Sequence, residues 1–185
     1  MSKKVIVLLA DGFEDVEAVT PIDYLRRAGI EVTTVSISRN LTVTSKWGGI
    51  KLTADTTLEQ ISGHADWDAV IIPGGMPGAA NLASSQAAGN LVKEIAAAGK
   101  IAAAICASPV LVLAPLGLIS GKKFTCYPGM EKQIADASWQ DDRVVVDGNI
   151  ITSRAAGTTG EWAIAIIENL LDKASAQKIA ETVLL

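Results

Sequence analysis

The chain of 185 residues carries 16 Lys and Arg against 20 Asp and Glu, which gives a formal net charge of -4 at pH 7. This balance creates no basic field for binding nucleic acid, and a hydrophobic content of 49% is enough to bury the core of one domain. We therefore expect a single domain over residues 1–185. None of the apolar runs approaches the roughly 20 residues of a membrane-spanning helix, so we expect a cytoplasmic protein without membrane contact.

Short apolar runs alternate with amphipathic stretches along the chain. This pattern is typical of parallel strands that are buried on both faces between crossover helices. The sequence therefore predicts an α/β fold with a doubly wound, mostly parallel central sheet. The predicted strands are Lys4–Ala10, Glu31–Ser36, Asp68–Pro73, Lys100–Ile105 and Ile150–Ser153.

The first predicted helix covers residues Glu14–Ala28, where apolar residues keep helical spacing and Gly29 supplies the stop. Pro21 lies inside this helix and lacks an N–H, so the carbonyl of Glu17 loses its intrahelical partner. A break of this kind beside an acidic residue marks either a functional site or a tolerated kink.

Three features organise the C-terminal part. The turn Asp147–Asn149 separates two apolar runs and predicts a hairpin with an antiparallel strand pair. Thr158 and Glu161 have the spacing of a capping box, which predicts a helix from there to about Leu171. A final helix is expected over Ala174–Val183.

Cys106 stands where the strand Lys100–Ile105 changes into a helix opened by Pro109, with small residues on both sides. This is the pattern of a nucleophile elbow, a tight turn that lifts a side chain above the carboxyl edge of the sheet. The N–H groups at a helix start lower a thiol pKa from ~8.5 to roughly 3.5–7.5, which predicts a thiolate at neutral pH. The alternative, a buried cysteine that only packs, is disfavoured by the elbow.

Ligands of doubly wound sheets sit beyond the carboxyl ends of the strands, where several loops meet. The loops expected there are Asp11–Glu17, which contains Glu14, and Gly74–Gly78. The pair Gly74 and Gly75 lets the backbone come close and aim N–H groups at an oxyanion. These residues are therefore candidates for a pocket around the thiol.

Two cysteines and one histidine are too few for a disulfide framework or a structural zinc site, so we expect no metal. Cys126 is either a structural thiol of a strand or a resolving partner for an oxidised Cys106. His64 lies in a polar connection before a strand, where we expect a surface role.

Several segments, taken in order, resemble the DJ-1/PfpI superfamily, and most closely its DJ-1/YajL/ThiJ branch. The resemblance covers essentially the whole chain and implies a flavodoxin-like sandwich that works without a cofactor, usually as a homodimer. The matching segments are Asp11–Glu17, Thr20–Gly29, Ile72–Gly75, Ala103–Pro109 and Thr152–Arg154, followed by Gly157 and Thr158.

The resemblance also implies roles for individual residues. Cys106 would be an oxidisable nucleophile, and Glu17 a protonated acid that hydrogen-bonds its sulfur. Gly75 and Ala107 would offer backbone N–H groups nearby. The physical reading agrees, because a carboxyl buried beside a thiolate must hold its proton.

The sequence departs from the family pattern at the rim of the expected pocket. Tyr127 takes the place of a histidine found in many members, so a Cys-His dyad for proteolysis or amide transfer is not expected. Trp47–Gly49 replaces a segment that contributes an arginine near the site in some relatives, and Ala155–Ala156 replaces a Gly-Pro pair. Arg154, just before this pair, is a further pocket candidate.

Two functions from different classes fit these residues. The first is a cofactor-independent glyoxalase or deglycase that acts on small reactive aldehydes, such as methylglyoxal, or on glycated adducts. The alternative is an oxidative-stress sensor or redox-regulated chaperone in which Cys106 becomes a sulfinate. A role in thiazole biosynthesis, suggested by the ThiJ name, lacks support because no phosphate-binding loop is present.

Overall fold

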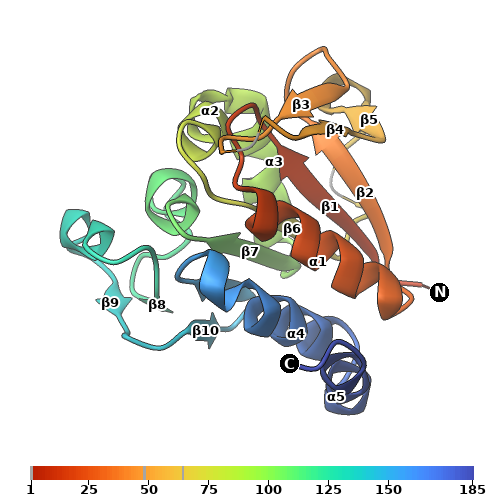
Figure 1. Cartoon of the computed structure of the whole chain (residues 1–185). Coiled ribbons are helices and arrows are strands. Elements are labelled where there is room, and N and C mark those ends of the chain that lie inside the picture. Colours follow the sequence, from red (N-terminus) through yellow and green to blue (C-terminus); the bar gives the residue numbers. More distant parts are fainter. Residues whose placement is uncertain (1, 48, 64) are drawn as a thin grey trace.

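The computed structural model describes residues 2–47, 49–63 and 65–185. A seven-stranded sheet forms its centre, in the spatial order β10, β11, β7, β6, β1, β2, β5 (Figure 1). Neighbours pair in parallel except at the antiparallel hairpin of β10 and β11. The doubly wound, mostly parallel sheet is thus confirmed. Its strands are β1 (Lys4–Leu9), β2 (Glu31–Ser36), β5 (Thr56–Thr57), β6 (Ala69–Ile72), β7 (Ile101–Ile105), β10 (Val144–Asp147) and β11 (Ile150–Ser153).

Helices cover both faces of the sheet and make a three-layer α/β/α sandwich (Figure 1). One face carries α1 (Asp15–Arg27), α4 (Thr159–Leu170) and α5 (Lys173–Thr182), and the other carries α2 (Gly78–Ser84) and α3 (Gln86–Ala97). Alternate residues of β1 enter the two cores, because successive side chains of a strand point to opposite faces.

Two pairs of shorter strands accompany the main sheet. Two strand pairs, β3 (Thr42–Thr44) with β4 (Lys51–Thr53) and β8 (Lys123–Phe124) with β9 (Ser138–Trp139), lie outside the main sheet. Strands of two or three residues carry too little alternation to be recognised in a sequence. No helix among the described residues combines the length and the apolar character that crossing a bilayer requires.

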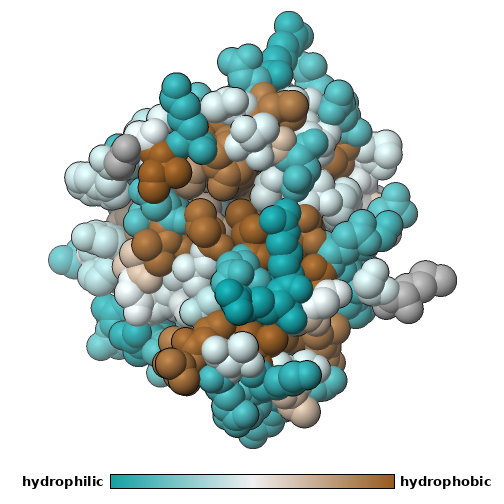
Figure 2. Space-filling model, turned by 45° about the vertical axis from the view of Figure 1, so that its right-hand side comes forward, coloured by the Kyte–Doolittle hydropathy of each residue, from teal (hydrophilic) through white to brown (hydrophobic). Residues whose placement is uncertain are grey.

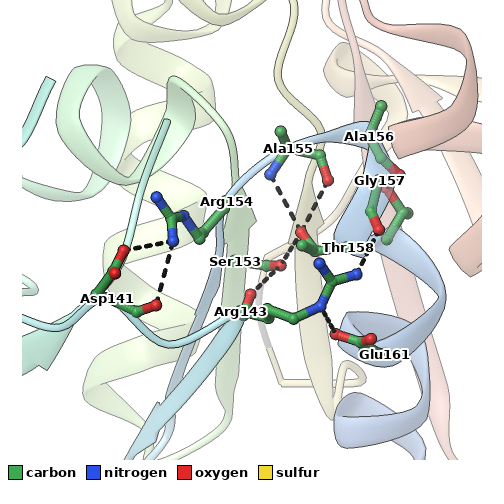
Figure 3. Close-up of polar contacts among 10 residues, drawn as sticks. Asp141, Arg143, Ser153, Arg154, Ala155, Ala156, Gly157, Thr158 and Glu161 are labelled. Atoms are coloured by element: carbon green, nitrogen blue, oxygen red, sulfur yellow. Dashed lines mark hydrogen bonds and ion pairs between the residues drawn. The ribbon is translucent and has the colours of Figure 1, made fainter. Parts of the chain in front are cut away.

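The capping box predicted for the start of α4 is wrong. Glu161 binds Arg143 instead, and no side chain caps this helix. The hydroxyl of Thr158 turns back and accepts the N–H of Ala155 at 3.1 Å (Figure 3). The spacing of the two residues fits a capping box, but Arg143, just before β10, binds Glu161, and the turn before α4 engages the hydroxyl of Thr158.

Candidate functional site

Cys106 directly follows β7 and adopts φ 64, a left-handed conformation that a residue other than glycine rarely takes. Its N–H donates to the carbonyl of Ser153 at 3.0 Å, and its carbonyl accepts the N–H of Tyr127 at 2.8 Å. Such strain costs about 1–3 kcal/mol and persists only where the surroundings impose it. The elbow predicted from the sequence is therefore present and held from two sides.

The segment after the elbow differs from the expected helix. Residues Pro109–Leu113 form a short π-helical segment, and the Ser108 hydroxyl anchors its start by donating to the carbonyl of Pro73 at 2.6 Å. A helix this short has too few aligned peptide units to build a strong macrodipole at Cys106.

Glu17 lies in the first turn of α1 and is 1% exposed. Its Oε2 accepts the N–H of Gly74 at 2.9 Å, the N–H of Ala156 also donates to this carboxyl, and a side-chain hydrogen bond joins it to Cys106. The loops that follow β6 and β11 thus hold the carboxyl beside the sulfur.

Gly74 makes this approach sterically feasible. A Cβ atom at residue 74 would lie 2.5 Å from Oε2 of Glu17 and 2.6 Å from Cβ of Cys106. Contacts this short force atoms apart, so any side chain at this position would separate the carboxyl from the thiol. Glycine is required here for space, in addition to the backbone approach inferred from the sequence.

Burial, followed by the negative charge of Glu14, raises the pKa of Glu17 from 4.5 to about 7. Glu14 is close because its Oε2 accepts the N–H of Glu17 at 2.7 Å and caps α1. The hydrogen bonds from Cys106, Gly74 and Ala156 oppose the shift only in part. Below about pH 7 the carboxyl holds its proton, as the resemblance implied.

The resting thiolate predicted from the sequence is not supported. Burial raises the pKa of Cys106 from 9.0 to about 12, with the charge of Glu17 and its hydrogen bond adding to the effect. The N–H groups of Gly75 and Ala107 act in the opposite direction but do not prevail. Burial and the neighbouring carboxyl thus shift the pKa of Cys106 upwards, which favours the protonated thiol.

A cavity of about 540 Å³ opens above the pair. It contains most of the residues that the sequence placed there, and Gly74 lies beneath it between Glu17 and Cys106. The lining consists of Glu14, Glu17, Lys46, Trp47, Gly75, Met76, Cys106, Ala107, Tyr127, Pro128, Met130, Ala155 and Ala156.

Besides Gly74, two predicted pocket residues, Cys126 and Arg154, do not line the cavity. Cys126 is fully buried in the core on the α3 side of the sheet, where burial raises its pKa to about 12. Both cysteines are free. The guanidinium of Arg154 binds Asp141 instead (Figure 3). The surface role expected for His64 lies outside the described residues.

The sequence did not predict several other residues that line the cavity. Lys46, with its Nζ 4.3 Å from the centre of the Trp47 ring, reaches the cavity because the chain after β3 is bonded to the first loop. Specifically, the N–H of Lys46 donates to the carbonyl of Phe13 at 2.9 Å. The sequence indicates Trp47 only as a replacement at the rim and Met76 only as a member of the loop Gly74–Gly78, and nothing in the local sequence indicates Pro128 or Met130.

The fold and this site define a class: flavodoxin-like α/β proteins with a cysteine on a strained elbow and a buried carboxyl at its side. The chain belongs to the DJ-1/PfpI family, whose family model matches residues 3–169.

Similar proteins extend across distant organisms. DJ-1 homolog B of Arabidopsis thaliana is 41% identical over 97% of this chain, which spans only 41% of that relative's length. A Pyrococcus abyssi protein named deglycase is 34% identical over 86% of this chain and 94% of its own. The solved structure of oxidised DJ-1 from Toxoplasma gondii has a TM-score of 0.94 at 38% identity, covering 99% of this chain and 98% of that one.

Proposed function

We propose that this protein is a cofactor-independent enzyme that acts on small reactive carbonyl compounds or their adducts, with methylglyoxal as the representative substrate. The observation that carries the proposal is a strained cysteine at the base of a cavity, hydrogen-bonded to a carboxyl whose pKa is about 7. The deglycase name of the Pyrococcus abyssi relative supports the same substrate class.

The first step is addition of the thiol to the aldehyde. Sγ of Cys106 attacks the carbonyl carbon, a C–S bond forms, and the π-electron pair moves to the carbonyl oxygen. Glu17 takes the thiol proton and returns it to this oxygen, which yields a neutral hemithioacetal. The N–H groups of Gly75 and Ala107, which face sulfur, are the nearest donors for the developing negative charge.

With methylglyoxal the adduct can isomerise without an external oxidant. The Glu17 carboxylate removes the proton from the carbon that carries sulfur, and reprotonation of the neighbouring carbon turns the enediol into a lactate thioester. Water hydrolyses the thioester and releases lactate and the thiol. One carbon is oxidised and its neighbour is reduced, so water is the only co-reactant.

The test follows lactate formation from methylglyoxal in the absence of glutathione. We expect turnover by the wild type and by Cys126→Ala, whose residue lies outside the cavity, and none by Cys106→Ser. Lactate production no higher in the wild type than in Cys106→Ser would overturn the proposal.

The pH dependence gives a second test. Because the base form of Glu17 accepts the proton, we expect the rate to rise with pH through about 7 and to level off above it. Glu17→Gln should lose turnover over the whole range. A wild-type rate that is flat between pH 5.5 and 8.5 would contradict the role of Glu17.

A second candidate function is redox sensing, favoured by the same donors around sulfur and by the oxidised state of the Toxoplasma gondii structure. One equivalent of peroxide would convert the thiol into a sulfenic acid and water, and a second would give the sulfinic acid and water. Mass spectrometry after peroxide treatment, with Cys106→Ser as control, measures this. Sulfinate at Cys106 in a protein that forms no lactate would favour the sensor.

The cytoplasmic location expected from the sequence also remains a proposal. Both cysteines are free, and reducing compartments keep thiols in that state.

A further inference from the structure

We propose that Thr158, together with Ser153, is a positioning residue: its hydroxyl fixes the turn that presents the N–H of Ala156 to Glu17, and thereby tunes proton transfer between Glu17 and Cys106. The inference rests on the proposed Glu17–Cys106 pair and adds residues that do not touch the substrate.

The turn over residues 153–158 is closed by hydroxyl groups. Oγ1 of Thr158 accepts the N–H of Ala155 at 3.1 Å and lies 2.8 Å from the carbonyl of Ala155 and 2.7 Å from Oγ of Ser153 (Figure 3). Ser153 donates to the carbonyl of Arg143 at 2.8 Å, and Thr158 donates to the carbonyl of Ala155. Each hydroxyl carries one hydrogen, so the two groups share their hydrogens between these carbonyls and the contact that joins them.

This turn contacts both members of the reactive pair. The carbonyl of Ser153 accepts the N–H of Cys106, and the N–H of Ala156 donates to the carboxyl of Glu17. Ser153 is fully buried and Thr158 is 6% exposed, so water does not readily replace these hydroxyls. A change in the conformation of the turn would therefore move the N–H of Ala156 relative to the carboxyl of Glu17.

The contacts of Arg143 stabilise the solvent-exposed side of the turn more weakly. Arg143 donates to the carbonyl of Gly157 at 2.7 Å and to Glu161 at 2.6 Å, but both ionic side chains are substantially exposed. Exposed ion pairs contribute little because water and salt screen them. The buried hydroxyls are therefore the part of the network that fixes Ala156.

Removing the Thr158 hydroxyl leaves the ionisable groups around Glu17 in place. The ionisable groups facing it are Glu14 from its own helix, Cys106 from the elbow, and Lys46 and Tyr127 across the cavity. A hydrogen bond to the charged form of a carboxyl stabilises that form, so weakening the Ala156 contact favours the protonated acid. The expected direction is a higher pKa of Glu17.

The test is a pH titration of the Glu17 carboxyl carbon by NMR in protein labelled with ¹³C-glutamate, with Glu17→Gln used to assign the signal. In Thr158→Val we expect the titration midpoint to rise by about 0.5–1 pH unit, the equivalent of one weakened hydrogen bond. Thr158→Ser, which keeps the hydroxyl, should restore the wild-type midpoint. Thr34→Val removes an equally buried hydroxyl of β2, bonded to Asp55, and should leave the midpoint unchanged.

An unchanged midpoint in folded Thr158→Val would overturn the inference. Should that variant fail to fold, Ser153→Ala removes the partner hydroxyl and carries the same expectation and the same refutation. The titration needs no turnover, so a wild type that forms no lactate refutes the proposed enzyme while leaving this inference to be decided by the midpoints.

Discussion

At the scale of single residues, the protonation state of Cys106 is set by groups that folding brings to it. Small residues around Cys106 and a proline after it are visible in the chain, and they predict the elbow. The pKa of the thiol depends instead on burial and on Glu17, which is 89 positions away in the chain and arrives through folding. A sequence shows neither desolvation nor the charge of a distant neighbour, so the predicted thiolate was wrong.

The raised pKa of Glu17 has a consequence for stability. Between about pH 4.5 and about 7 the unfolded chain has released the Glu17 proton while the folded protein still holds it. Unfolding therefore releases a proton in this window, and the free energy of unfolding falls as pH rises. Above pH 7 the loss amounts to about 3 kcal/mol, the cost of a buried carboxylate.

We expect Glu17→Gln to escape this loss. Its free energy of unfolding relative to the wild type, measured by urea denaturation, should increase from pH 4.5 to pH 7.5. Glu168→Gln, which removes an exposed carboxylate of α4, should show no such trend. A constant difference between wild type and Glu17→Gln across this range would contradict the buried, proton-holding carboxyl.

At the scale of elements, segments with a clear apolar pattern are predicted well by the sequence. The predicted strands Glu31–Ser36 and Ile150–Ser153 have the same first and last residues as β2 and β11. The predicted final helix begins and ends one residue later than α5. The predictions that fail do so because of tertiary contacts. Arg143 binds Glu161, which was expected to cap α4, and Asp141 binds Arg154, which was expected to line the pocket. The Lys46–Trp47 part of the lining arises from loop contacts that leave no periodic signal.

The Gly74 position provides a test of how the elements meet. Gly74→Ala should drive the loop after β6 away from α1, destabilise the protein by about 1–3 kcal/mol and slow alkylation of Cys106. Gly157→Ala is the matched control, since a Cβ there would meet no atom within 4 Å. Urea denaturation and the rate of iodoacetamide labelling measure both effects. Equal stability and equal labelling rates in the two variants would show that the space at residue 74 does not determine how the loop packs against α1.

At the scale of the whole molecule, association with a second copy remains a proposal. Figure 2 shows an apolar band across the face on which α1 lies. Val16 and Val19 are 46% and 47% exposed, three positions apart on this helix, and so lie on the same side of it. Exposed apolar surface of this kind is typical of an interface, which fits the homodimer implied by the family resemblance.

Sedimentation velocity tests the dimer. We expect the wild type to sediment as a dimer and Val19→Asp to shift towards the monomer, because a carboxylate cannot be buried in an apolar contact without large cost. Leu41→Asp changes a similarly exposed residue before β3 and should leave the dimer intact. A monomeric wild type would refute the interface.

The two edge strands of the main sheet have a consequence for aggregation. One edge strand, β5, has only two residues, and the other, β10, runs antiparallel to its neighbour and has β8 packed against it. Long, unpaired edge strands recruit other chains into intermolecular sheets, and short or covered edges prevent this. The two edges of the main sheet therefore offer little free backbone for pairing with another chain.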